Sequence, residues 1–146
     1  MNRIALTTLA VATAVCAVGG VAEAKHKKPI EKSYTATAPT PDPTNYSMTG
    51  YSVCAQNVPQ SFHIEEFTAP EPGTLKAELT GYVGDWDFLL VDDKGRELAN
   101  SGLTAFMGEP EKMTYKFKKP GTVSIIACNW AGGPTGKVKY TFTFAK

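Results

Sequence analysis

Hydrophobic and polar side chains alternate with a period of two along much of residues 61–144. The clearest example is residues 82–99, in which Trp86, Phe88 and Leu90 alternate with acidic and aliphatic residues. A period of two places alternate side chains on opposite faces of a β-strand. The sequence Asp-Asp-Lys-Gly at residues 92–95 is typical of a tight turn. We therefore expect a β-hairpin whose first strand buries Trp86, Phe88 and Leu90.

Five further segments show related patterns and are separated by residues typical of turns. They predict strands at residues 61–67, 74–80, 112–117, 122–128 and 137–144, with a loop at residues 129–136. In the first of these strands, Phe62 and Ile64 are expected on one face, His63 on the solvent side, and a bulge at Glu65 and Glu66. Seven or eight short strands, most with one polar face, predict an all-β fold, either an antiparallel β-sandwich or a barrel.

The N-terminal residues have the pattern of a secretory signal peptide. Arg3 precedes an apolar and small-residue run over residues 4–21, and Ala-Glu-Ala follows at residues 22–24. A charged start, an apolar middle and a small-x-small end predict cleavage after about Ala24, and Cys16 would be removed with the leader. A retained membrane anchor is the alternative, but we expect a secreted, extracellular protein without stable membrane insertion.

Residues 25–50 differ in composition from the rest of the chain. A basic cluster, Lys-His-Lys-Lys at residues 25–28, is followed by four prolines set among Thr, Ala and Ser. This composition predicts an extended or disordered linker, because it offers little apolar surface to bury. The expected organisation is a signal peptide at 1–24, a linker at 25–50 and a β-sandwich domain at 51–146.

Two cysteines, Cys54 and Cys128, remain after the leader is removed. Cysteines of exported proteins most often pair, so we expect a disulfide between them. A bridge that closes so long a loop stabilises the fold by about 4 kcal/mol in the chain-entropy model. The formal net charge of +1 gives no indication of nucleic-acid binding.

Several short motifs, taken in order, resemble those of the bacterial pre-peptidase C-terminal domain. They are Pro-Gly-Thr-Leu at 72–75, Gly-Asp-x-Asp-x-x-Leu-x-Asp-x-x-Gly at 84–95, Pro-Gly-Thr at 120–122 and Tyr-x-Phe-x-Phe at 140–144. The resemblance implies a jelly-roll β-sandwich of the kind appended to secreted proteases. No peptidase domain precedes the motifs here, and the cysteine pair is not part of the family pattern. These departures favour a free-standing secreted domain.

Catalytic motifs are not found. After the leader, the histidines are His26 and His63, and no Gly-x-Ser-x-Gly elbow accompanies them. We therefore expect that the protein is not an enzyme.

Two pairs of residues are candidates for binding. Asp85 and Asp87 lie on one face of a strand, about 7 Å apart, where they could hold calcium; alternatively, they accept hydrogen bonds from loop N–H groups. Asn129 and Trp130 begin a glycine-rich loop, where the indole could stack on a sugar and Asn129 could offer its amide. The alternative role for Trp130 is to cover the core.

The sequence thus favours a secreted, non-catalytic binding or adhesion module. Its expected partner is an extracellular polysaccharide or protein, and we expect no binding to nucleic acid. We expect no cofactor, with calcium as a possible exception, and a monomeric protein. The alternative is a structural or regulatory secreted protein, such as a modulator of a separately encoded protease.

Overall fold

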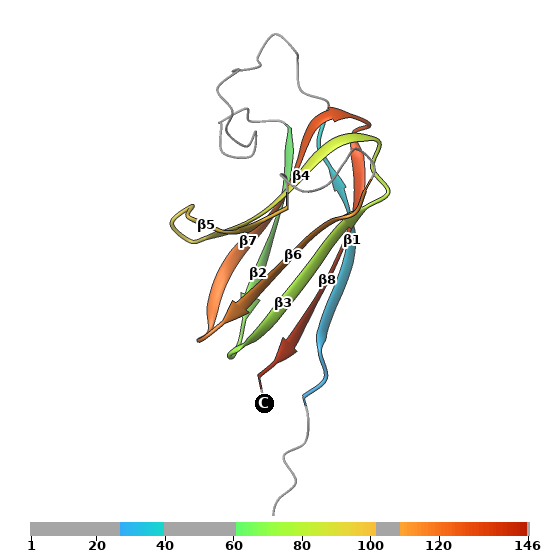
Figure 1. The fold of residues 1–146 in the computed structure, drawn as a ribbon. Helices are drawn as coiled ribbons and strands as arrows, with labels where there is room; N and C mark the ends of the chain where they lie inside the picture. Colours follow the sequence, from blue (N-terminus) through green and yellow to red (C-terminus); the bar gives the residue numbers. More distant parts are fainter. Residues whose placement is uncertain (1–26, 40–60, 102–108, 146) are drawn as a thin grey trace, which may run out of the picture.

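The computed structural model describes residues 27–39, 61–101 and 109–145, and within them the chain forms eight β-strands and no helix (Figure 1). The strands are β1 (Ile30–Thr37), β2 (Phe62–Ala69), β3 (Gly73–Thr80), β4 (Gly84–Asp92), β5 (Glu97–Asn100), β6 (Glu111–Phe117), β7 (Gly121–Gly132) and β8 (Thr135–Phe144). They form two four-stranded sheets. Sheet I has the order β1-β8-β3-β6, and sheet II has the order β2-β7-β4-β5. In the part of the chain that the structure describes, no helix could cross a bilayer.

The strand pairs are nested around the β4–β5 hairpin. β4 pairs with β5, β3 with β6, β2 with β7 and β1 with β8, all antiparallel. The chain is therefore one long hairpin whose successive pairs fall in alternate sheets, and β3–β8 and β4–β7 pairing joins them within each sheet. This connectivity is that of a jelly roll. The expected all-β antiparallel sandwich of jelly-roll type is confirmed.

The hydrophobic core lies between the two sheets and follows the alternation of the sequence. Trp86, Phe88 and Leu90 of β4 are essentially fully buried, as predicted. Alternate residues of β3, β7 and β8 meet them from both sides, including Leu75, Leu79, Ile125, Val138 and Phe142. Burial of apolar side chains on one face of each strand is what holds the two layers together.

The prediction that residues 25–50 form a disordered linker is wrong for its central part. β1 pairs with β8 from Ile30 opposite Phe142 to Thr37 opposite Thr135. Ala36 lies in the core, so a small side chain is enough to seal this edge of the sandwich. Composition misled the prediction, because β8 supplies the hydrogen bonds that β1 needs. The folded domain thus begins before residue 51; the expected signal peptide, at residues 1–24, and residues 40–60 lie outside the described residues.

The prediction for β2 is also corrected. Its register with β7 runs without interruption, so there is no bulge at Glu65 and Glu66. Phe67 is buried between the sheets, and His63 has the same parity. The His63 ring accordingly stacks on Tyr34 of β1, with centroids 5.3 Å apart, instead of pointing to solvent. Ile64 is left 52% exposed.

Candidate functional site

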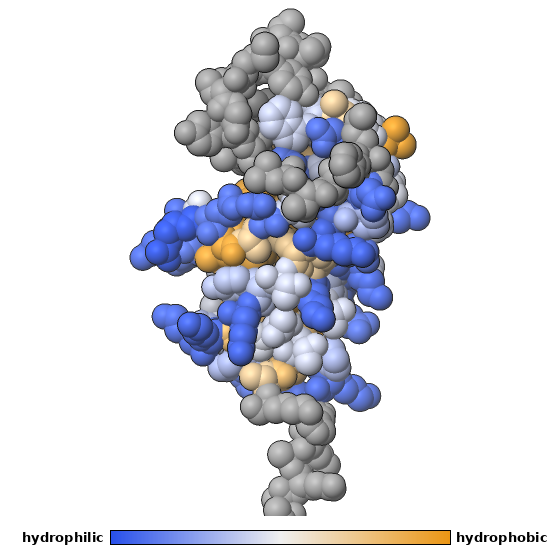
Figure 2. Space-filling model, in the orientation of Figure 1, coloured by the Kyte–Doolittle hydropathy of each residue, from blue (hydrophilic) through white to orange (hydrophobic). Residues whose placement is uncertain are grey.

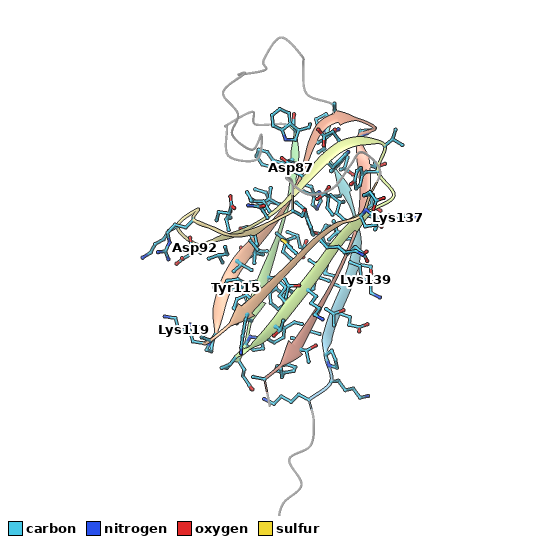
Figure 3. All side chains as sticks on the ribbon, in the orientation of Figure 1. Asp87, Asp92, Tyr115, Lys119, Lys137 and Lys139 are labelled. Atoms are coloured by element: carbon cyan, nitrogen blue, oxygen red, sulfur yellow. The ribbon has the colours of Figure 1, made fainter. Side chains whose placement is uncertain are left out.

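Two residues that the sequence assigned to different sites meet at one end of sheet II. β4 and β7 pair with a register shift, so that Trp86 lies opposite Asn129 and Asp85 opposite Ala131. Trp130 is the extra residue between these pairs, which makes it a β-bulge. Its indole N–H donates a hydrogen bond to Asp87, with 2.5 Å between Nε1 and Oδ2. Figure 3 labels Asp87 at this end of the sandwich.

Asn129 does not reach the surface. It is fully buried on the core face of β7. Its side-chain N–H₂ donates to the carbonyl oxygens of Ala38 (3.1 Å) and Gly133 (3.2 Å), and its backbone N–H donates to that of Ser61 (2.8 Å). The expected contact between Asn129 and a ligand is therefore replaced by a structural role, because its side chain and backbone together tie β7 to the segments around Ala38, Ser61 and Gly133.

The two aspartates of the calcium hypothesis lie in different surroundings. Asp85 is exposed, whereas Asp87 is buried and accepts the hydrogen bond from Trp130. Calcium needs six to eight oxygen ligands. Among the described residues, no group of three or more His, Cys, Asp or Glu side chains is placed to hold a metal ion. The structure thus adds no third carboxylate to this pair.

Glycines close the same end of the sandwich. Gly84 and Gly132 lie opposite each other with φ angles of 94° and 129°. A Cβ atom on Gly84 would lie 1.9 Å from the carbonyl oxygen of Ala131, and one on Gly132 would lie 2.0 Å from that of Val83. The β3–β4 connection therefore packs directly against the end of β7.

A buried polar pair stabilises this end from inside. Glu111, at the start of β6, is only 4% exposed, and its Oε1 accepts a hydrogen bond from the Tyr82 hydroxyl at 3.3 Å. Tyr82 also donates to the carbonyl oxygen of Glu109. Burial raises the pKa of both the Glu111 carboxyl and the Tyr82 hydroxyl. Both residues are buried, and Tyr82 belongs to the hydrophobic core, so their hydrogen bonds support the fold at this end of the sandwich.

The outer face of sheet I has a different character. Its outward side chains are nearly all threonine, serine, lysine or glutamate, and we name it the Lys/Thr face. They are Glu31, Ser33, Thr35 and Thr37 on β1; Lys137, Lys139, Thr141 and Thr143 on β8; Thr74, Lys76, Glu78 and Thr80 on β3; and Lys112, Thr114 and Lys116 on β6. Figure 2 shows hydrophilic and weakly polar side chains over these strands.

Charge is unevenly distributed between this face and the rest of the chain. The Lys/Thr face carries five lysines and two glutamates, a formal charge of +3, whereas the whole chain carries +1. Lys112 forms an ion pair with Glu78 (3.3 Å between Nζ and Oε1). No salt bridge joins Lys76, Lys116 or Lys137 to another described residue. Most of the positive charge on this face is therefore available to a partner.

Two open depressions lie side by side on the Lys/Thr face. The first is bordered by side chains of β3, β6 and β8, including Lys76, Lys112 and Thr114. The second is bordered by β1, β3 and β8, including Thr35 and Lys137. Lys139, which Figure 3 labels, borders both depressions and therefore lies between them.

The sequence shows which residues are polar on each of these strands, but it does not show which strands lie side by side. Lysine and threonine alternate with apolar residues in β3, β6 and β8, a pattern that predicts polar faces only. Lys139, Glu78 and Lys112 become neighbours because the strand order is β8-β3-β6. That order depends on pairing between distant segments and is not encoded in any one of them.

Comparisons with known proteins do not assign a family. No protein-family model matches the chain, and no curated protein matches it. Among solved structures, the crystal structure of the infectious bursal disease virus VP2 subviral particle is similar over 82% of this chain and 34% of that one. The identity is 9% and the TM-score 0.33, and a similarity this low supports no conclusion about family or function.

Proposed function

We propose that this chain is a secreted, non-catalytic binding module that recognises an extracellular polysaccharide or protein. The observation that carries the proposal is the Lys/Thr face, a four-stranded surface of hydroxyl and ammonium groups. Threonine hydroxyls both donate and accept hydrogen bonds, and lysines donate three, so this face suits a polar ligand.

The rigidity of the scaffold supports the same function. The strands that carry this face are hydrogen-bonded to their neighbours, and the inward side chains of the same strands pack in the core. A preformed surface loses little conformational entropy when a ligand binds. The Lys/Thr face therefore suits recognition of an extended polymer that lies across several strands.

Secretion and the family resemblance belong to the same proposal. The sequence of residues 1–24 supports export, and the jelly-roll connectivity agrees with what the resemblance to pre-peptidase C-terminal domains implies. This fold is shared by many unrelated proteins, so it gives the resemblance weak support. The Lys/Thr face, and not the fold, is the main support for the proposed function.

We also propose that Cys54 and Cys128 form a disulfide. Cys128 is fully buried on the outer face of sheet II, beside Leu89 and Ile126. Its partner in the sheet is Phe62, and Cys54 precedes Ser61 by seven positions, within roughly 25 Å of extended chain. Peptide mapping of the exported protein without reductant should recover the two cysteines in one linked fragment. Recovery of two free thiols would contradict the pairing.

The proposed function is tested by retention on insoluble ligands. The exported protein is incubated with a panel of neutral and acidic polysaccharides and with collagen, and the bound fraction is measured after washing. We expect retention on at least one of them, and loss of it when Lys139 and Thr141, on the outer face of β8, are both replaced by glutamate. The matched control replaces Lys94, in the β4–β5 turn, and Thr68, an exposed residue of β2, by glutamate, which changes the formal charge by the same amount away from the Lys/Thr face. No retention on any ligand would contradict a binding module.

A further inference from the structure

We infer that the ligand of the Lys/Thr face is an acidic polysaccharide, bound along a diagonal row of lysines that crosses three strands. The inference rests on the proposed function and narrows its ligand class. It is argued from the register of sheet I, from the charges that remain unpaired on it, and from the side chains that surround them.

The register places four lysines in one row, which follows β8 for one step and then crosses β3 and β6 diagonally. Lys139 lies opposite Glu78, and Thr141 lies opposite Lys76, between β8 and β3. Thr74 lies opposite Lys116 between β3 and β6. The row therefore runs from Lys137 and Lys139 on β8, through Lys76 on β3, to Lys116 on β6, and we name these residues the lysine diagonal.

The spacing along the lysine diagonal is regular. Residues two positions apart along a strand, which point to the same face, are separated by roughly 7 Å, and neighbouring strands are separated by roughly 4.8 Å. Lys137 and Lys139 are thus roughly 7 Å apart at the backbone, and each later step along the diagonal is roughly 8 Å. Four positive charges at near-equal intervals match a polymer whose negative groups repeat at regular intervals.

Acidic residues lie beside the diagonal and do not interrupt it. Glu78 pairs with Lys112, which is not a member of the row. Glu31 is on the edge strand β1, opposite Thr141. Each of these glutamates therefore borders the row on one side, and the row itself stays cationic.

The neighbours of the lysines favour a sugar chain over other polyanions. Thr114 and Thr141 flank Lys76 across the sheet, and Thr74 lies beside Lys116. Their hydroxyls can pair with sugar hydroxyls and carboxylates. Among the described outward residues of these strands there is no aromatic side chain. Single-stranded nucleic acids are bound largely by stacking on aromatic residues, whereas the carboxylates and hydroxyls of an acidic sugar chain can be bound by lysine and threonine without stacking. Large apolar side chains that would enter a bilayer are likewise not found at those positions.

The experiment measures binding of the exported protein to soluble polymers of defined charge. The probes are polygalacturonate, dextran sulfate and uncharged dextran, with a single-stranded DNA oligomer and phosphatidylglycerol vesicles as other anions. We expect binding to polygalacturonate or dextran sulfate and not to dextran, with affinity falling at least about tenfold between 50 and 200 mM salt. We expect Lys139→Glu to weaken this binding roughly tenfold. Lys94→Glu, in the β4–β5 turn, changes the net charge equally and should leave the affinity within about twofold.

The outcomes separate the inference from the proposed function. Equal weakening by Lys139→Glu and Lys94→Glu would overturn the inference, because net charge alone would then explain binding. Binding to the DNA or to the vesicles as tight as to polygalacturonate would overturn the choice of a polysaccharide. Retention on neutral glycans or collagen without any binding to acidic ones would overturn the inference and leave the proposed function standing. Circular dichroism melts of both variants, expected to match the parent protein, confirm that the fold is unchanged.

Discussion

Trp130 donates its indole N–H to the carboxylate of Asp87 across the two central strands of sheet II. The sequence suggested a sugar-stacking role for Trp130 and a calcium-binding role for Asp87. The hydrogen bond, 2.5 Å between Nε1 and Oδ2, gives each residue a partner within the protein. It also holds the bulge that lets β7 continue to Gly132.

Replacing Asp87 by alanine should destabilise the protein. The substitution removes a charged acceptor from a buried position, and such hydrogen bonds contribute about 1.5–3 kcal/mol. We expect a loss of that size in the free energy of unfolding, measured by urea denaturation. Asp87→Asn keeps an acceptor oxygen and should lose less. An Asp87→Ala protein as stable as the parent would show that the bond to Trp130 does not support the fold.

Calcium should have little effect on stability. Because Trp130 occupies one carboxylate oxygen of Asp87 and Asp85 is exposed, the pair lacks the converging oxygens that calcium needs. A ligand that binds the folded state raises the midpoint of thermal unfolding. We expect the same midpoint in saturating calcium and in chelator. A higher midpoint in calcium that disappears in Asp85→Asn would instead support the calcium site.

Gly84 should be the least replaceable glycine at the end of the sandwich. Alanine there would combine a φ of 94° with a Cβ 1.9 Å from the carbonyl oxygen of Ala131. We expect Gly84→Ala to cost about 3 kcal/mol or more in the free energy of unfolding. The control is Gly121→Ala, where a Cβ would meet nothing within 4 Å; it should change stability by less than about 0.5 kcal/mol. Similar costs for both substitutions would contradict the close approach.

The buried carboxyl of Glu111 should make stability depend on pH. Burial raises its pKa above the ordinary value of 4.5, while hydrogen bonds from Ser101 and Tyr82 act in the opposite direction. A raised pKa means that the contribution of Glu111 to stability is complete below the ordinary pKa and is lost as the pH rises through the folded-state pKa. Glu111→Gln should therefore raise the free energy of unfolding at neutral pH, by about 1 kcal/mol.

Unfolding curves measured from pH 4 to pH 8 check this prediction. The difference between Glu111→Gln and the parent should grow with pH and then level off. Glu66→Gln, at an exposed position of β2, is the matched control and should follow the parent at every pH. A Glu111→Gln protein that is less stable than the parent at neutral pH would show that the ionised carboxylate is required.

The local part of the fold could be predicted from the sequence because alternation is a local signal. The β4–β5 hairpin and its turn are one example. Asp92 accepts hydrogen bonds from the backbone N–H and the guanidinium of Arg96 and from the backbone N–H of Lys94, and these bonds lower the pKa of its carboxyl. Trp86 is in the core for the same reason, since its strand parity was visible in a few residues.

The strand order, the extent of β1 and the surroundings of the candidate site residues could not be predicted, because they depend on contacts between distant segments. β1 has a weak pattern of its own and is a strand because β8 lies beside it. His63 points toward Tyr34 because Phe67, four positions later, fixes which face of β2 enters the core. Asn129 was expected at a ligand because the sequence cannot show that Ala38 and Gly133 surround it. The Lys/Thr face follows the same rule, because strand order decides which lysines become neighbours.

The central claim is that the Lys/Thr face, and not the end of the sandwich near Trp130, is the binding surface. Amide chemical-shift mapping tests it most directly: the isotope-labelled protein is titrated with a polygalacturonate oligomer. We expect the largest shifts on β3, β6 and β8, centred on Lys76 and Lys139, with little change at Trp130 and Gly132. Shifts confined to the residues around Trp130, with Lys76 and Lys139 unmoved, would contradict it.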